Sequence, residues 1–528
     1  MKYANGDVYE GDWKVNKRSG EGKLVRADGS TYEGRWRGDQ PDGLGKESFV
    51  GGSWYEGAFK AGSITGSGIY HYESGDEYTG ALVEGSREGE GTMRYASGDV
   101  YEGPWHSNKK EGRGTLHLCN GDSYEGDFID DLYNGEGVLT FAAGGSYSGS
   151  FENGLFEGEG ELQESDGSSF VGRFHGGQRH GQGELTYANG DVYDGDFVGG
   201  VRHGEGEMLW ANGDHYDGMW EDGLMHGTGV HTTASGQSYD GQFVRGMRNG
   251  TGVMTFATEG QYTGEWKDNM RHGSGEMTFF DGSRYTGQWA HDQRHGEGKY
   301  AYVSGGSYEG SWAKGKKNGF GVLSNAKGRY EGYWLNAQKH GHGEMAYLNG
   351  NSYVGEWAHN KKDGTGVMTY LSGARYEGEW HKDKMHGHGE YEYPNGATYS
   401  GSWQDGKKEG HGELRLPTGE EYAGDWKDNL KHGQGKQVNE DKSVYDGTWA
   451  EGVRCGCGVM HFANGDVYDG EWRNDAQEGE GKMTFRDGAV FEGNWKEGVR
   501  HGKGVLLMTS GERAEGVWRS DVLTVPAK

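Results

Sequence analysis

Histidine is the residue whose placement in this chain most suggests metal chemistry, because it recurs just before a Gly-x-Gly segment. The nine positions are His180, His203, His226, His272, His295, His340, His386, His432 and His501. Zinc needs several ligand atoms about 2 Å from the ion. If the nine residues belong to successive two-stranded units, they lie roughly 10 Å apart, and one column cannot chelate a metal within a chain. We expect these rings to pack at hairpin ends, and we predict neither a bound metal nor another cofactor.

Cysteine offers one further metal-like pair, Cys455 and Cys457, which flank Gly456. Strand alternation would place both thiols on one face, where they could form part of a metal site or an inter-chain thiol contact. A lone Cys-x-Cys is a weak metal signal without a second pair nearby, so ordinary packing is the favoured interpretation. The third cysteine is Cys119, and three cysteines are too few for a disulfide framework, which indicates a reducing compartment.

Carboxylates and glycines recur too often to mark an active site. An acidic residue such as Glu10, Glu33 or Asp194 follows the first aromatic residue of a repeated segment in 15 of 23 occurrences. A catalytic pair needs one enclosed setting, whereas a residue repeated this often indicates a solvated face. The Gly-x-Gly segments also lack the following helix and the Lys-Ser/Thr of phosphate-binding loops. We therefore predict that the chain is not an enzyme.

Lysine pairs in the polar connections are the candidate contacts to an anionic surface. They are Lys109, Lys110, Lys316, Lys317, Lys361, Lys362, Lys407 and Lys408. The favoured interpretation is solubility and protection against edge-to-edge association. The alternative is docking to anionic phospholipid headgroups or to an acidic partner, where about 1 kcal/mol per basic residue can accumulate. The net charge of -29 argues against nucleic acid as a partner.

A 23-residue repeat must position all of these residues. An aromatic-x-Gly-x-aromatic segment begins at Tyr9, returns at Tyr32 and continues through 23 registers to a degenerate copy at Ala514. One step, from Tyr308 to Tyr330, is one residue short. The second aromatic position is Trp in 16 registers and Phe in six. Almost all tryptophan is therefore placed by the repeat.

Hydrophobic alternation predicts two β-strands in each repeat. Tyr193, Gly195 and Phe197 share one face and acidic residues share the other, as in a half-buried strand. The second half of the repeat alternates likewise. Polar connections such as residues 198–203 are expected to join the two halves, and Asn-Gly turns such as Asn212-Gly213 join consecutive repeats. Glycine between two rings normally weakens a strand, so we expect neighbouring rings to lie across it. The predicted fold is all-β: an elongated, curved, single-layer antiparallel β-meander, a solenoid-like array of 23 hairpins.

The repeated Tyr-Glu-Gly-x-Trp, with its polar connection, His-Gly-x-Gly and Asn-Gly-Asp-x-Tyr, resembles the MORN (membrane occupation and recognition nexus) repeat. The resemblance covers residues 1 to about 518. It implies a curved antiparallel sheet, often in elongated dimers, that scaffolds cytoskeletal structures, cilia and flagella, or membrane–cytoskeleton junctions. It also implies phospholipid binding, which the sequence determines only weakly.

We expect one repeat array over residues 1–518, with the short repeat at 308–329, and a tail or cap over residues 519–528. No segment remains for a catalytic domain. Val522, Leu523 and Val525 are expected either to cap the last strand or to pair with a second chain. The resemblance favours a homodimer formed through the end strands.

The favoured function is a non-catalytic scaffold or adaptor that organises a cytoskeletal, ciliary or flagellar protein assembly. The expected location is cytoplasmic, at the cytoskeleton, the cilium or flagellum, or the cell cortex. Exposed portions of an aromatic concave face would hold a partner's extended segment or helix. The ten residues assigned to it are Tyr353, Trp357, Tyr376, Trp380, Tyr399, Trp403, Tyr422, Trp426, Tyr445 and Trp449. The alternative function is a phosphoinositide-binding adaptor that acts through the basic loops.

Overall fold

Antiparallel strands form the architecture of this chain. The computed structural model describes residues 1–526, and these contain 47 strands and no helix. The described residues accordingly hold no helix able to cross a membrane. The strands fall in two units, Met1–Thr258 with Trp266–Asn269, and Glu259–Glu265 with Met270–Lys528. The predicted all-β antiparallel meander is confirmed.

The strands of the first unit are β1 (Val8–Lys14), β2 (Lys17–Val25), β3 (Thr31–Arg37), β4 (Gln40–Ser48), β5 (Trp54–Lys60), β6 (Ser63–His71), β7 (Glu77–Val83), β8 (Ser86–Arg94), β9 (Val100–His106), β10 (Lys109–Lys110), β11 (Gly112–His117), β12 (Ser123–Ile129), β13 (Leu132–Thr140), β14 (Ser146–Glu152), β15 (Leu155–Gln163), β16 (Ser169–His175), β17 (Gln178–Thr186), β18 (Val192–Val198), β19 (Val201–Leu209), β20 (His215–Glu221), β21 (Leu224–Thr232), β22 (Ser238–Val244) and β23 (Met247–Thr255). Strand β24 (Gly260–Lys267) has residues in both units.

The strands of the second unit are β25 (Met270–Phe279), β26 (Arg284–Ala290), β27 (Gln293–Ala301), β28 (Ser307–Ala313), β29 (Lys316–Asn325), β30 (Gly328–Leu335), β31 (Gln338–Tyr347), β32 (Ser352–Ala358), β33 (Lys361–Thr369), β34 (Arg375–His381), β35 (Lys384–Glu392), β36 (Thr398–Gln404), β37 (Lys407–Arg415), β38 (Glu421–Lys427), β39 (Leu430–Val438), β40 (Val444–Ala450), β41 (Val453–His461), β42 (Val467–Arg473), β43 (Ala476–Thr484), β44 (Val490–Lys496), β45 (Val499–Leu507), β46 (Arg513–Arg519) and β47 (Val522–Pro526).

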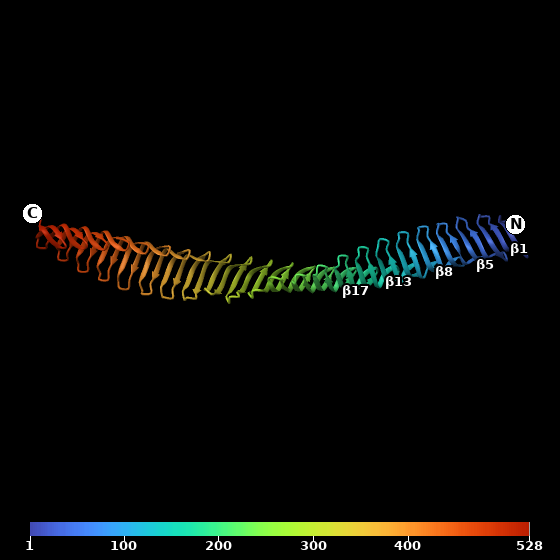
Figure 1. Ribbon diagram of the computed structural model, residues 1–528, viewed down its shortest axis with the longest axis horizontal. Coiled ribbons are helices and arrows are strands. Elements are labelled where there is room, and N and C mark those ends of the chain that lie inside the picture. The colour runs from blue at the N-terminus through green and yellow to red at the C-terminus, as the bar shows by residue number, and fades with distance from the viewer. Residues whose placement is uncertain (527–528) are drawn as a thin grey trace. The chain divides into compact units, whose positions relative to one another are not determined.

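Each repeat is one hairpin, and consecutive strands pair with each other, except β10 and β11, which both pair with β9 as two parts of one interrupted strand. In the first unit, β18 pairs with β19 and β19 pairs with β20, both antiparallel. In the second unit, β40, β41 and β42 pair in the same order. Figure 1 shows this succession in the first unit, from β1 through β5, β8 and β13 to β17.

The two strands of a repeat are joined by a turn of only two residues, shorter than the polar connection expected over residues 198–203. In the hairpin of β18 and β19 these residues are Gly199 and Gly200, with φ of 58° and 84°. Two positive φ values define the tight turn whose twist matches that of paired strands. Asp or Asn occupies these positions in other repeats, for example Asp130 and Asp131 with φ of 52° and 73°, because these residues tolerate this backbone region best after glycine.

The core lies on one side of the sheet, which we call the aromatic face. Tyr193, Phe197 and Met208 are each at most 2% exposed. The Tyr193 ring meets Phe197 of its own repeat edge-on at 5.1 Å and Trp220 of the next repeat at 5.3 Å. Edge-to-face pairs add about 0.5–1.5 kcal/mol to the burial of each ring. Rings thus link each repeat to the next.

The recurring glycines make room for these rings. Gly195 pairs with Gly206 across the hairpin, and a Cβ placed on Gly206 would lie 2.3 Å from Tyr193 Oη. The tyrosine therefore lies directly over the bare backbone, as the sequence suggested. Its hydroxyl donates a hydrogen bond of 3.0 Å to the carbonyl oxygen of Asp196.

The short repeat changes one inter-repeat turn. Strand β29 extends to Asn325 and pairs there with Gly328, the first residue of β30, so Ala326 and Lys327 form a two-residue turn. At the C-terminal end, β47 pairs antiparallel with β46 and completes a hairpin from part of the predicted tail. Residues 527–528 of that tail lie outside the described residues.

Candidate functional site

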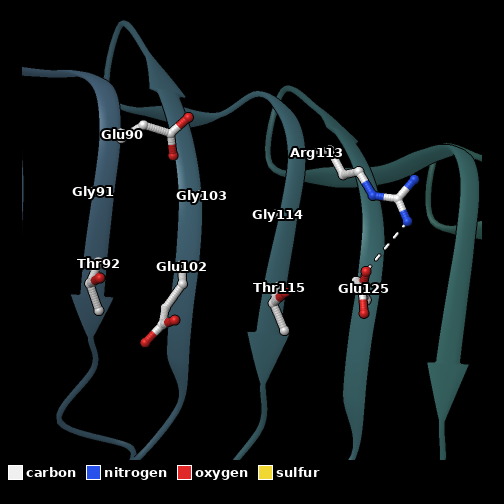
Figure 2. Close-up of a pocket in the computed structure, with 9 residues that line it drawn as sticks. All are labelled: Glu90, Gly91, Thr92, Glu102, Gly103, Arg113, Gly114, Thr115 and Glu125. Carbon is white, nitrogen blue, oxygen red and sulfur yellow. Dashed lines mark hydrogen bonds and ion pairs between the residues drawn. The ribbon is translucent and has the colours of Figure 1, made fainter.

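The side of the sheet opposite the aromatic face, the polar face, is hollowed where glycines align. One hollow of about 510 Å³ lies over β8, β9, β11 and β12 (Figure 2). Its floor is the backbone of Gly91, Gly103 and Gly114, and carboxylates stand around it. Within it, an Arg113 guanidinium nitrogen lies 3.4 Å from Glu125 Oε1. The recurring acids thus line an open, solvated surface.

Exposed ion pairs cross the strands of the polar face. Examples are Lys23–Glu33 at 2.7 Å and Lys46–Glu56 at 2.9 Å, and all four side chains are at least 47% exposed. Pairs this exposed contribute at most about 1 kcal/mol each. This face therefore keeps the sheet solvated, and its acids have the environment of surface carboxylates.

The ten aromatic residues predicted to contact a partner are buried in the core of the second unit. Their tyrosines are at most 1% exposed and their tryptophans at most 5%; they are Tyr353, Trp357, Tyr376, Trp380, Tyr399, Trp403, Tyr422, Trp426, Tyr445 and Trp449. Parts of these rings were expected to be exposed, whereas the structure buries them almost completely. The rings contact one another from repeat to repeat, as Tyr376 contacts Trp380 at 5.1 Å and Trp403 at 5.6 Å. They build the sheet and leave almost no ring surface for a partner.

A column of cations covers these rings on the aromatic face. Lys362 Nζ lies 3.9 Å from the centre of the Trp380 ring, and Lys408 Nζ lies 4.6 Å from that of Trp426. In the first unit, Arg202 covers Trp220 at 4.4 Å in the same way. Cation–π contacts of this kind contribute about 0.5–2 kcal/mol, depending on how far the cation is desolvated.

The structure therefore divides the eight predicted basic residues into two groups. The second lysine of each pair joins the cation column, whereas the first is exposed. The packed group is Lys110, Lys317, Lys362 and Lys408, and the exposed group is Lys109, Lys316, Lys361 and Lys407. Two of the exposed lysines form ion pairs with the loop of the next repeat, Lys109–Asp130 at 2.7 Å and Lys407–Asp428 at 2.6 Å. The predicted basic edge thus presents fewer free charges than the sequence suggested.

Burial lowers the pKa of the packed lysines. It lowers the pKa of Lys317 and of Lys408 to about 8, because an ammonium loses hydration against the rings. Burial also lowers the pKa of Lys110 and Lys362, and in both residues a nearby aspartate opposes the shift. The sequence signal that could have located this column is a basic residue at this position in 15 of 22 repeats.

The cysteines and histidines lie along the strands and turns. Cys457 is exposed and stands opposite Glu471, whereas Cys455 lies in the irregular part of the β40–β41 pairing. Burial raises the pKa of the Cys455 thiol. His226 Nδ1 lies 3.0 Å from the Glu221 carboxylate at a hairpin end. Across residues 1–526, no group of three or more such side chains is arranged to hold a metal ion.

A feature that sequence reasoning missed is a row of exposed apolar residues at the inter-repeat turns of the second unit. We call this row the turn ridge; it consists of Phe280, Val303, Leu348 and Leu371, which are 66%, 64%, 75% and 75% exposed. Most repeats of the first unit carry a small residue there, such as Ala211. The signal in the sequence is an apolar first turn residue directly after an aromatic one, as in Tyr370-Leu371.

Comparison with solved structures gives distant likenesses, and no match was found among curated proteins. The TCP domain of Drosophila melanogaster SAS-4 (dCPAP), solved with a proline-rich motif of Ana2 (dSTIL), is 15% identical; the match covers 33% of this chain and 83% of that chain, with a TM-score of 0.16. The TCP10 domain of Danio rerio CPAP is 10% identical over 46% of this chain and 93% of that chain, with a TM-score of 0.15. Scores this low carry no argument about function.

Comparison with protein families gives an extensive match. The MORN repeat matches 22 consecutive segments, from residues 9–31 to residues 491–513, and the short one covers residues 308–328. Each full-length matched segment begins at the first aromatic residue of a repeat and ends just before that of the next, which is the hairpin unit described above. The chain belongs to the MORN-repeat family.

Proposed function

We propose that this chain is a non-catalytic scaffold that binds protein partners of a cytoskeletal or ciliary assembly in the cytoplasm. The observation that carries the proposal is the turn ridge, in which Val303, Leu348 and Leu371 are each at least 64% exposed. Exposed apolar side chains gathered in this way favour a protein contact. The cytoskeletal or ciliary setting comes from the family resemblance.

The repeat explains how such a surface can vary while the fold stays constant. Tyrosine, glycine and tryptophan columns build the sheet, and the exposed turn residue has no part in the core, so it can change from Ala211 to Leu371 without loss of packing. Equivalent turn residues recur about 10 Å apart, two strands per repeat. A partner that spans several repeats would therefore meet the same geometry several times.

The alternative, adhesion to anionic phospholipid through the basic loops, has weaker support. Lys110, Lys317, Lys362 and Lys408 pack on rings, and Lys109 and Lys407 are paired with aspartates. The same ridge also fits a second copy of this chain; the mass of the purified chain in solution, with the ridge intact and truncated, distinguishes the two partners.

The proposal predicts that truncating the ridge releases the protein from the cytoskeleton. We expect tagged wild-type chain to stay with the detergent-insoluble cytoskeleton of ciliated cells, and the double variant Leu348→Ala/Leu371→Ala to become largely soluble. Alanine is native at the equivalent turns of the first unit, so the variant should fold normally. Leu44→Ala on the polar face, where Leu44 is 69% exposed, is the matched control and should behave as wild type.

Two results would contradict the proposal. One is a wild-type chain that is fully extracted and diffuse in the cell. The other is equal retention of wild type and double variant. A purified chain that is dimeric only with the ridge intact would identify the partner as a second copy.

A further inference from the structure

The short repeat opens a pocket on the aromatic face of the second unit. The pocket has a volume of about 430 Å³, within the range of small-ligand sites. Lys317, Lys327 and Lys339 line it, and Tyr330 and Trp334 form its floor. No carboxylate is among the described residues that line it, although the chain as a whole carries a net charge of -29.

The opening is a direct consequence of the shortened turn. The flanking repeats place a half-buried ring at the start of their inter-repeat turns, Tyr302 on one side and Tyr347 on the other. Asn325 takes this place in the short repeat and pairs with Gly328 across a two-residue turn. A ring is therefore missing between Tyr302 and Tyr347, and the pocket, which Asn325 lines, lies where it would stand.

The Lys317 and Lys339 ammonium groups contact rings instead of acids. Lys317 Nζ lies 4.8 Å from the centre of the Trp334 ring, and Lys339 Nζ lies 4.6 Å from that of Tyr330. Lys339 Nζ also approaches Met345 Sδ at 3.6 Å. None of the three pocket lysines forms a salt bridge with any residue in the described part of the chain.

Lys317 and Lys339 lack the carboxylate that six other cations of the column meet in the next hairpin turn. In one such pair, the Arg18 amide donates to Asp39 Oδ1 at 2.8 Å, and its guanidinium lies 3.6 Å from the same oxygen. For Lys317, the turn residue that corresponds to Asp39 is Ala337, whose amide donates to the Lys317 carbonyl oxygen. For Lys339, the corresponding turn residue is the neutral Asn360.

The environment therefore favours an anion. Burial is the main cause that lowers the pKa of Lys317 and of Lys339 to about 8. Arg294 adds to the shift at Lys317; at Lys339, Lys327 adds to the shift and Asp383 opposes it. A carboxylate placed between these ammonium groups would replace the hydration that they have lost, and charge-assisted hydrogen bonds are the stronger kind.

We propose that this pocket binds an aspartate or glutamate side chain of a partner peptide whose neighbouring residues are apolar. The inference rests on the scaffold function proposed above, because it names the chemistry of the segment that the turn ridge holds. The ridge residues Val303 and Leu348 belong to the turns on either side of the pocket, so apolar residues flanking the acid would meet them. The ring floor and the apolar flanks favour a peptide over an inorganic or lipid phosphate, which brings no apolar side chains.

The test uses the full chain and a library of random short peptides. Peptides selected on wild type, after depletion on the Ala337→Asp variant, should carry Asp or Glu beside apolar residues. In a synthetic selected peptide, Glu→Gln or Asp→Asn should weaken binding about tenfold, as expected for loss of a charge-assisted hydrogen bond. Binding is measured by fluorescence anisotropy at constant salt.

Two variants of the chain block the pocket in different ways. Ala337→Asp restores the loop carboxylate; Ala337 has a φ of 67°, close to the 73° of Asp39, so aspartate fits this backbone. Asn325→Tyr restores the missing ring and leaves every charge in place. Each should weaken peptide binding about tenfold.

Matched controls separate the pocket from general charge effects. Asn336→Asp adds the same negative charge one residue away, outside the pocket lining. Lys408→Met removes a lysine with the same kind of contacts, at 4.9 Å from Tyr399 and 4.6 Å from Trp426, far from the pocket in sequence. Both variants should bind the selected peptides about as tightly as wild type does.

The outcomes distinguish this inference from the scaffold proposal. Selected peptides that lack acids, or that bind Ala337→Asp as tightly as wild type, would overturn the pocket assignment while leaving the scaffold in place. Failure to select any peptide, together with binding to phosphatidylserine vesicles that Ala337→Asp abolishes, would assign the pocket to lipid and overturn the peptide proposal. Loss of the scaffold itself would appear separately, as full extraction of wild type from the cytoskeleton.

Discussion

At the scale of single residues, the contact between tyrosine and glycine decides the packing. Gly206 has no side chain where a Cβ would lie 2.3 Å from Oη and 2.6 Å from Cζ of Tyr193. The ring is fully buried and pinned by its hydrogen bond to the Asp196 carbonyl oxygen, so it cannot move aside without loss of both contacts. Space, and not backbone conformation, makes glycine necessary at this position.

We expect Gly206→Ala to destabilise its hairpin by about 1–3 kcal/mol, the usual cost of an added methyl in a packed site. The measurement is hydrogen exchange of the backbone amides in β18 and β19, since an array of repeats opens locally before it unfolds as a whole. Glu205→Ala, on the polar face one residue away, is the control and should change stability by less than about 0.5 kcal/mol. Equal protection in Gly206→Ala and wild type would show that the ring is free to shift.

At the scale of the element, the sequence predicts the two strands of the hairpin but not the residues at which they begin and end. The 23-residue period and the alternation around Tyr193 predicted two strands per repeat and the side on which the rings lie. Arg202 was assigned to a polar loop, yet β19 begins at Val201 and Arg202 lies over Trp220. Long basic side chains are usually exposed, so a basic residue does not by itself indicate packing on a ring. The recurrence of a basic residue at this position in most repeats could have indicated it.

The candidate site was less predictable than the fold for a physical reason. Residue types that recur at equivalent positions identify the core, whereas a binding surface is formed by residues that differ from the repeat pattern. Leu348, Leu371 and the pocket at Asn325 are departures from the pattern, and each departure depends on what neighbouring repeats place beside it. A single repeat therefore holds too little information to locate them.

The cation column predicts an unusual dependence of stability on pH. Burial lowers the pKa of Lys408 to about 8 in the folded chain, whereas an unfolded lysine has a pKa of roughly 10.4. Between these values the unfolded chain binds more protons, so this lysine makes the folded chain more stable as pH rises from 8 to 10. The variant Lys408→Met should lose this contribution, and methionine is already native in the same column at Met385.

The measurement is the urea midpoint of unfolding, followed by circular dichroism at pH 8, 9 and 10. We expect the midpoint of wild type to rise more over this range than that of Lys408→Met. Lys407→Met is the control, because Lys407 is exposed and paired with Asp428, which raises the pKa of Lys407. Parallel curves for wild type and Lys408→Met would show that the buried lysine keeps its proton as an exposed one does.

At the scale of the whole molecule, both units draw their stability from the same repeated tyrosine, which occupies the first aromatic position in 20 of 23 registers. Burial is the largest cause that raises the pKa of these phenols: to about 12 at Tyr78 and Tyr147 of the first unit, and upward from the usual value at Tyr353 of the second. A core that repeats one titratable side chain so often has a common weakness at alkaline pH.

The sign of the effect is opposite to that of the buried lysines. Above pH 10 an unfolded tyrosine loses its proton while the buried one keeps it, so the folded chain binds more protons and stability falls as pH rises. The contribution of Tyr147 is fully present below pH 10 and is lost as the pH rises to about 12. Because the shift recurs in repeat after repeat, we expect both units to unfold steeply in this window, with tyrosinate absorbance rising together with the loss of β-sheet circular dichroism.

Tyr147→Phe, which copies the native Phe170, should weaken this pH dependence locally, as followed by the urea-dependent exposure of its hairpin to protease. Ionisation of the column tyrosines near pH 10 while the sheet remains intact would mean that these rings ionise without unfolding, and would contradict the buried column as the source of alkaline instability.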